Sequence, residues 1–100
     1  MASWMRFGLV TEIPAGQSKV STIGKLEIAV FNRDGVFYAV NNFCPHAGGP
    51  LNQGFIEKDR VVCPYHGWSF PLSMEDAPND GLPRYPVRVQ DGAIEVEVPD

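Results

Sequence analysis

The chain has 100 residues, of which 44% are hydrophobic and 20% charged, and its formal net charge is −4 at pH 7. This length fits one domain, expected to span residues 1–100, and the composition is too apolar for a disordered chain. The acidic balance without any lysine-arginine cluster argues against nucleic acid and membranes as partners. No apolar run approaches the roughly 20 residues of a membrane span, and the first residues do not resemble a signal peptide, so we expect a cytoplasmic protein.

The expected elements are short strands. In chain order, the strand-like runs are Arg6–Ile13, Ser18–Thr22, Leu26–Phe31, Val36–Val40, Leu51–Ile56, Arg60–Val62, Val87–Gln90 and Ala93–Val98. In the runs that begin at Leu26 and Ala93, apolar residues alternate with other residues at a period of two. That period predicts strands with one face in the core and one face in water.

Turn signals separate these runs. Asp34-Gly35 and Asp91-Gly92 each lie between two strand-like runs, and they predict hairpins because glycine adopts positive φ at low cost. The chain has ten glycines and nine prolines, well spread, and shows no convincing helical period. The sequence therefore predicts an all-β fold, a small antiparallel β-sandwich or barrel.

Every cysteine and histidine of the chain belongs to one constellation. Cys44 and His46 are two positions apart, and Cys63 and His66 follow after sixteen intervening residues. Both pairs lie in segments rich in glycine and proline, which predicts loops. A hairpin around Glu57-Lys58-Asp59 is expected to return the chain between them. We therefore expect the two loops to lie side by side at one end of the fold.

These residue types fit more than one role. A disulfide is disfavoured because a cytoplasmic chain is kept reduced. A Cys2His2 zinc site accepts the same donors, although structural zinc sites usually combine C-x2–4-C with H-x3–5-H. Here each loop contributes one thiol and one imidazole, which a two-metal cluster explains better, with the cysteine of each loop on one metal and the histidine on the other.

The segments Cys44-Pro45-His46-Ala47-Gly48-Gly49-Pro50-Leu51 and Cys63-Pro64-Tyr65-His66-Gly67-Trp68-Ser69-Phe70 resemble the two cluster-binding loops of Rieske-type [2Fe-2S] proteins. The likeness covers almost the whole chain and implies a β frame with a two-loop cluster-binding subdomain at about residues 43–70. It implies one [2Fe-2S] cluster, with Cys44 and Cys63 on one iron and His46 and His66 on the other.

The resemblance also bears on the reduction potential. Rieske centres span about −150 to +300 mV, above the about −400 mV of plant-type ferredoxins, whose cluster has four cysteine ligands. High-potential respiratory members have an extra cysteine in each loop, where this chain has Gly49 and Tyr65, and two hydroxyl donors to cluster sulfur, where it has Trp68 and Phe70. Fewer donors stabilise the added electron less, so we expect a potential near the −150 mV end.

The resemblance implies an electron carrier rather than an enzyme. Rieske ferredoxins take electrons from a flavin-dependent reductase and pass them to a terminal oxygenase, and we expect this chain to do so as a monomer. The alternatives are the small subunit of an assimilatory nitrite reductase and, from another class, a zinc-stabilised interaction module. One departure from the ferredoxin pattern begins at Pro71-Leu72-Ser73, where we expect the backbone to follow a different route.

Overall fold

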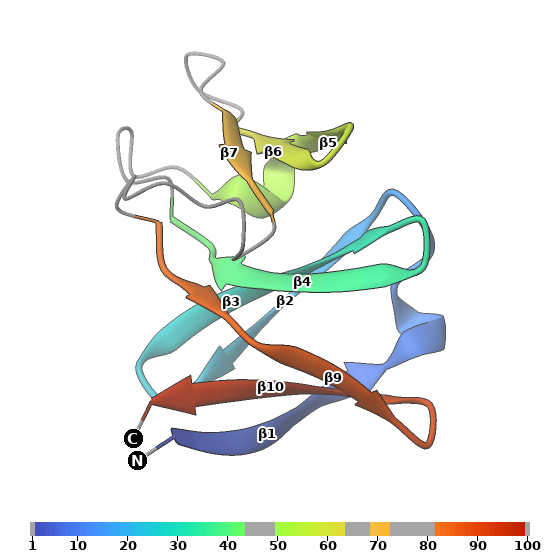
Figure 1. The fold of residues 1–100 in the computed structure, drawn as a ribbon. Helices are drawn as coiled ribbons and strands as arrows, with labels where there is room; N and C mark the ends of the chain where they lie inside the picture. Colours follow the sequence, from blue (N-terminus) through green and yellow to red (C-terminus); the bar gives the residue numbers. More distant parts are fainter. Residues whose placement is uncertain (1, 44–49, 64–68, 73–81, 100) are drawn as a thin grey trace.

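The computed structural model describes residues 2–43, 50–63, 69–72 and 82–99 (Figure 1). The strands in them are β1 (Ala2–Leu9), β2 (Ser18–Ile23), β3 (Leu26–Arg33), β4 (Val36–Asn41), β5 (Phe55–Glu57), β6 (Arg60–Val62), β7 (Ser69–Pro71), β8 (Arg84–Tyr85), β9 (Val87–Gln90) and β10 (Ala93–Pro99). Two short 3-10 helices complete the set, η1 (Val10–Glu12) and η2 (Leu51–Gln53). The described ranges contain no α-helix, and no helix in them is long and apolar enough to cross a membrane. The expected all-β class is confirmed.

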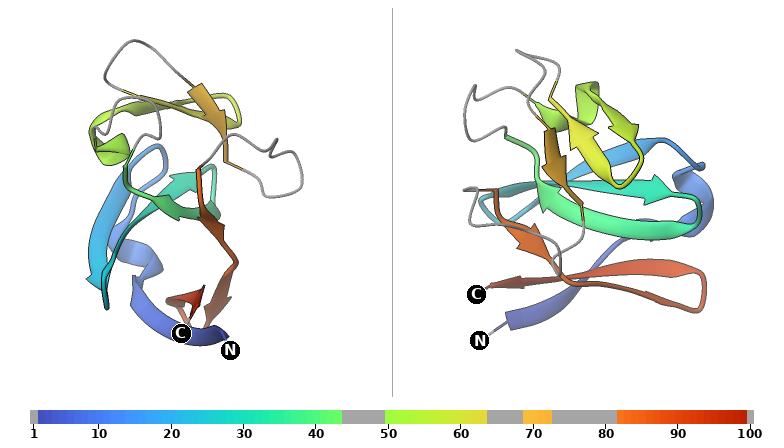
Figure 2. Two further views of the ribbon diagram at one scale, coloured as in Figure 1. Left: turned by 90° about the vertical axis from the view of Figure 1, so that its left-hand side faces the viewer. Right: turned by 45° about the horizontal axis from the view of Figure 1, so that its top comes forward.

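The strands form three antiparallel sheets that are stacked in layers (Figures 1 and 2). The basal sheet has the order β1-β10-β9, the central sheet β2-β3-β4-β8, and the loop-side sheet β5-β6-β7. Neighbouring strands pair antiparallel throughout. The central sheet therefore lies between two other layers, and this arrangement decides where its side chains go.

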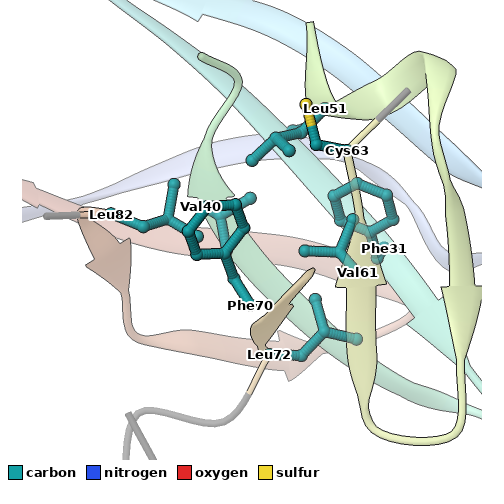
Figure 3. Close-up of a cluster of buried hydrophobic side chains, with 9 residues drawn as sticks. Phe31, Val40, Leu51, Val61, Cys63, Phe70, Leu72 and Leu82 are labelled. Atoms are coloured by element: carbon teal, nitrogen blue, oxygen red, sulfur yellow. The ribbon is translucent and has the colours of Figure 1, made fainter. Parts of the chain in front are cut away.

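Two hydrophobic cores fill the spaces between the layers. The basal core, between the basal and central sheets, contains Phe7, Ile13, Ile28, Val30, Ala39, Tyr85, Ile94, Val96 and Val98. The loop-side core, between the central and loop-side sheets, contains Ala29, Phe31, Val40, Leu51, Val61, Cys63, Phe70, Leu72 and Leu82 (Figure 3). Burial of these apolar side chains is the main favourable contribution to folding.

The prediction that one face of the strand is exposed to water is wrong for β3. Ile28 and Val30 point into the basal core, while Ala29 and Phe31 on the opposite face are 0% and 2% exposed in the loop-side core. The reason is the second layer, since the loop-side sheet covers the face that would otherwise meet water. In β10 the alternation has its expected meaning, with Ile94, Val96 and Val98 buried and the two intervening glutamates partly exposed.

Both predicted Asp-Gly turns are confirmed. Asp34 and Gly35 have φ of 52° and 91°, and Asp91 and Gly92 have φ of 53° and 77°. The flanking residues pair directly, so each turn is a two-residue hairpin with both central residues in the left-handed region. This is the turn whose twist matches that of the strands it joins.

Two predicted runs differ from the observed elements. The run Arg6–Ile13 is not one strand, because β1 ends at Leu9 and η1 follows. The run Leu51–Ile56 begins with η2, and the strand starts only at Phe55. In the first case Glu12 accepts a hydrogen bond from the Leu9 backbone N–H at 2.6 Å, which closes a turn that the apolar pattern does not reveal.

The same glutamate provides a pH-dependent contribution to stability. The Leu9 N–H and then the Lys19 ammonium, at 3.2 Å, lower the pKa of Glu12 below its usual 4.5. A lowered folded-state pKa stabilises the fold above the unfolded-state pKa, and the contribution is lost as pH falls through the folded value. Glu12→Gln should therefore have a lower melting temperature than wild type at pH 7. The difference in melting temperature between the two proteins should become smaller below pH 4.5. Thermal unfolding of both proteins across this range measures the effect, and a pH-independent difference would contradict it.

Candidate metal centre

Of the four predicted ligands, the structure describes Cys63. Cys44, His46 and His66 lie outside the described residues. Cys63 directly follows β6, and its side chain is 2% exposed in the loop-side core, which also contains Leu51 (Figure 3). The thiol is thus held at the point where the chain leaves the loop-side sheet for the second predicted loop.

The two ends of the first predicted loop are fastened together. Phe43 and Pro50, which flank residues 44–49, form an antiparallel bridge. One residue further out on each side, the Leu51 N–H donates to the Asn42 carbonyl at 2.7 Å. The Asn42 side chain also accepts from the backbone N–H of Asn52 at 2.8 Å. The first loop therefore leaves and re-enters the fold at one place.

The second predicted loop is closed by the loop-side sheet itself. Val62, the last residue of β6, pairs directly with Ser69, the first residue of β7. Arg60 reinforces this closure, since its guanidinium donates to the Ser69 hydroxyl at 3.0 Å and to the Ser69 carbonyl at 3.1 Å. Val62 and Ser69, which flank Cys63 and residues 64–68 in the sequence, are thus neighbouring positions on two paired strands.

A close backbone approach joins the ends of the two loops. Gly54 follows η2, which itself follows the first loop, and a Cβ built on Gly54 would lie 1.8 Å from the Val62 carbonyl oxygen. Only a residue without a side chain fits there. This contact sets the residues after the first loop directly against the residue before Cys63. The described ends of both loops therefore meet at one side of the molecule.

The segment that departs from the ferredoxin pattern is fixed at its described ends. The Leu72 N–H donates to the Asp59 carbonyl at 3.0 Å, and Arg84 donates to the carbonyls of Pro71 at 2.8 Å and Leu82 at 3.0 Å. Residues 73–81 lie outside the described part of the chain. At the position of Phe70, the high-potential Rieske proteins have a residue with a hydroxyl group. Phe70 is 2% exposed and packs in the loop-side core (Figure 3).

The described residues fit a cluster held between two loops. Thiolates and imidazoles are the donors that Rieske clusters use, and the one described donor is a buried cysteine at a loop end. Sequence reasoning missed three residues that shape this region, namely Asn42, Asn52 and Gly54. The local signal of Asn42 indicated only turn chemistry, and Gly54 has no local signal beyond being a glycine.

Comparison with known proteins identifies the family. A model of the Rieske [2Fe-2S] domain matches residues 3–86. The 3-phenylpropionate/cinnamic acid dioxygenase ferredoxin subunit of Escherichia coli (strain K12) is 36% identical over 97 residues, covering 91% of this chain and 90% of that protein. The Sphingomonas yanoikuyae B1 ferredoxin has a TM-score of 0.84 at 26% identity, covering 97% of this chain and all of that one. A proposed NADH-dependent nitrite reductase small subunit from Mycobacterium tuberculosis has a TM-score of 0.85 at 22% identity, covering 100% of this chain and 98% of that one.

The family match extends over most of the sequence, and the Escherichia coli relative is similar along nearly its whole length. Both findings agree with the layered β frame and with the paired ends of the two loops. The resemblance inferred from the cysteine and histidine spacing is confirmed, and the chain belongs to the Rieske [2Fe-2S] domain family.

Proposed function

We propose that this chain is a one-electron carrier that takes electrons from a flavin-dependent reductase and delivers them to a terminal oxygenase. The observation that carries the proposal is the 36% identity, over 91% of this chain, to a protein named as a dioxygenase ferredoxin subunit. The chain itself is then an electron-transfer component of a larger oxidoreductase system and not an enzyme. Family membership supports an iron-sulfur cluster in place of the zinc alternative.

The proposed ligands are Cys44 and Cys63 on one iron and His46 and His66 on the other. Support comes from the C-x-H and C-x2-H spacing, from the burial of Cys63 and from the joined loop ends. When bound, the cluster supplies a centre that accepts and releases one electron. Two neutral imidazoles in place of two thiolates leave that centre less negative, which raises its potential above that of four-cysteine ferredoxins. The potential is proposed to lie near the low end of the Rieske range.

We further propose that residues 1–100 act as a single domain, monomeric and cytoplasmic. The acidic net charge of −4 supports salt-sensitive, transient docking to basic surfaces of the redox partners. The likeness to the nitrite reductase small subunit, at 22% identity, concerns the fold alone. Size-exclusion chromatography of the protein from its native cells separates the two cases. A free carrier elutes alone, whereas a tightly bound subunit elutes with a large flavoprotein.

Anaerobic purification followed by an EPR-monitored reductive titration tests the carrier. The expected result is about two irons per chain and a rhombic Rieske-type signal that appears with a midpoint of about −150 mV. A colourless protein that contains zinc and gives no signal would refute electron transfer. A midpoint well above zero would instead show that hydrogen bonds to the sulfurs compensate for the missing hydroxyls.

Cys63→Ala is predicted to abolish cluster binding. Alanine removes the thiolate and leaves an apolar side chain in the loop-side core. Unlike serine, alanine adds no buried hydroxyl group, so a loss of iron reflects the missing thiolate and not an unpaired buried polar group. Iron per chain should fall from about two to near zero. Val61→Ala is the control, because Val61 is fully buried in the same core and is not a proposed ligand. That variant should be less stable by about 1–3 kcal/mol while it keeps its iron. Full iron content in Cys63→Ala would disprove the ligand assignment.

A further inference from the structure

Asn42 is a buried polar residue at the start of the first predicted loop. It follows β4, it is 2% exposed, and the only other polar residue buried in the described ranges is Asn32. A buried amide destabilises the fold unless its donors and acceptors are paired. The described ranges contain no buried side-chain nitrogen or oxygen without a partner, so both polar atoms of the Asn42 side chain are hydrogen-bonded.

The partners of Asn42 lie on both sides of the loop. Its backbone N–H donates to the Glu27 carbonyl at 2.9 Å, and its carbonyl accepts from the Leu51 N–H at 2.7 Å. Its side-chain oxygen accepts from the Asn52 backbone N–H at 2.8 Å. Its side-chain nitrogen donates to the Asn52 side-chain oxygen at 3.0 Å and to the Glu27 carboxylate at 2.7 Å. One side chain thus joins the end of β4, strand β3 and helix η2.

Glu27 and the Asn52 backbone N–H together fix which way the Asn42 amide points. A carboxylate accepts hydrogen bonds only, and a backbone N–H donates only. The amide nitrogen must therefore face Glu27 and the amide oxygen must face the Asn52 N–H, which is the arrangement observed. A carboxylate at position 42 would keep the acceptor for Asn52 but would place a second negative charge beside Glu27. This position therefore requires an amide.

We propose that Asn42 is a positioning residue for the cluster: its side chain, oriented by Glu27, holds the two ends of the first loop at the spacing that lets Cys44 and His46 bind. The inference rests on the proposed function, since it takes these two residues as ligands. Asn42 itself is not a proposed ligand. It acts through the loop whose ends it fastens, in the way that residues behind the ligands of a metal site orient those ligands.

The test is the near-isosteric variant Asn42→Asp and its charge-swapped rescue. In Asn42→Asp, repulsion between the new carboxylate and Glu27 should open the loop ends. Release of iron to a chelator should then be about 10–100-fold faster than in wild type, with shifted EPR g-values. In the double variant Asn42→Asp with Glu27→Gln, the glutamine amide can donate to the new carboxylate. That exchange of donor and acceptor should restore most of the wild-type release rate and spectrum.

Asn32→Asp is the matched control. Asn32 is 7% exposed, donates from its side chain to the Ile13 carbonyl at 2.7 Å, and accepts from the Gly35 N–H at 2.7 Å. It lies at the other end of the β3–β4 hairpin, beside the Asp34-Gly35 turn. Asn32→Asp should lower the melting temperature but leave the iron release rate and g-values unchanged. A merely structural role for Asn42 would make the two variants behave alike, which would overturn the inference.

The EPR signal of wild type and a milder variant, Glu27→Ala, distinguish the remaining outcomes. If wild type gives the Rieske signal but Asn42→Asp keeps both its iron and its spectrum, the inference fails and the proposed function stands. If wild type gives no such signal, both fail together. If Asn42→Asp does not fold, Glu27→Ala replaces it, because Glu27 is only partly buried and its loss removes one of the two acceptors of the Asn42 amide nitrogen. Glu27→Ala should then speed iron release severalfold, and an unchanged rate would overturn the inference.

Discussion

Replacing His66 by cysteine is expected to lower the midpoint potential by on the order of 100 mV. The substitution exchanges a neutral imidazole for a thiolate, so the centre that receives the electron becomes more negative. Rieske centres with two imidazoles begin at about −150 mV, whereas plant-type centres with four thiolates lie at about −400 mV. One exchanged ligand should cover part of that interval. An EPR-monitored redox titration of wild type and variant measures the shift.

Tyr65→Cys is the control for an added thiol. It places a cysteine next to the proposed ligand His66 without replacing any ligand. At this position the high-potential Rieske proteins have one of the two cysteines of their disulfide. The other half would need a cysteine at Gly49, so the disulfide of the high-potential members cannot form. The potential of Tyr65→Cys should stay near that of wild type. A fully loaded His66→Cys protein with an unchanged potential would show that His66 is not a ligand.

The sequence predicts the local features of the fold well. Each Asp-Gly turn forms the expected two-residue hairpin, because its conformation depends on residues that are neighbours in the chain. The interpretation of β3 fails because it depends on a distant element. Ala29 and Phe31 are buried by the loop-side sheet, and nothing within β3 shows that a second layer will cover that face. Periodicity detects a buried face but does not count the layers around a strand.

The candidate site likewise has local features that the sequence predicts and long-range features that it does not. The ligand types and their spacing lie in two short segments, so the motif predicts a family that the comparisons confirm. The residues that hold those segments together act over longer distances. Asn42 depends on Glu27, fifteen positions away, and on Asn52, ten positions away across the loop. From a single sequence, asparagines near a loop are interpreted as turn-forming residues. Only the folded arrangement shows which hydrogen bonds they make.

Gly54→Ala is expected to destabilise the protein by about 3 kcal/mol and to reduce cluster loading. The alanine Cβ would lie 1.8 Å from the Val62 carbonyl oxygen, so backbone on one side must move. The φ of Gly54 is −82°, outside the left-handed region that favours glycine, so the cost comes chiefly from the contacts of the new Cβ. Because Val62 directly precedes Cys63, the movement reaches a proposed ligand. Chemical denaturation gives the free energy of unfolding, and iron analysis gives the loading.

Gly92→Ala separates this contact from the general effect of removing a glycine. A Cβ on Gly92 would meet nothing within 4 Å, but the φ of +77° strains an alanine, at a cost of about 1 kcal/mol. This turn joins β9 and β10 in the basal sheet, which contains no proposed ligand. Gly92→Ala should therefore lose some stability and keep all its iron. If Gly54→Ala were no more destabilising than Gly92→Ala and equally well loaded, the approach of Gly54 to Val62 would not position Cys63.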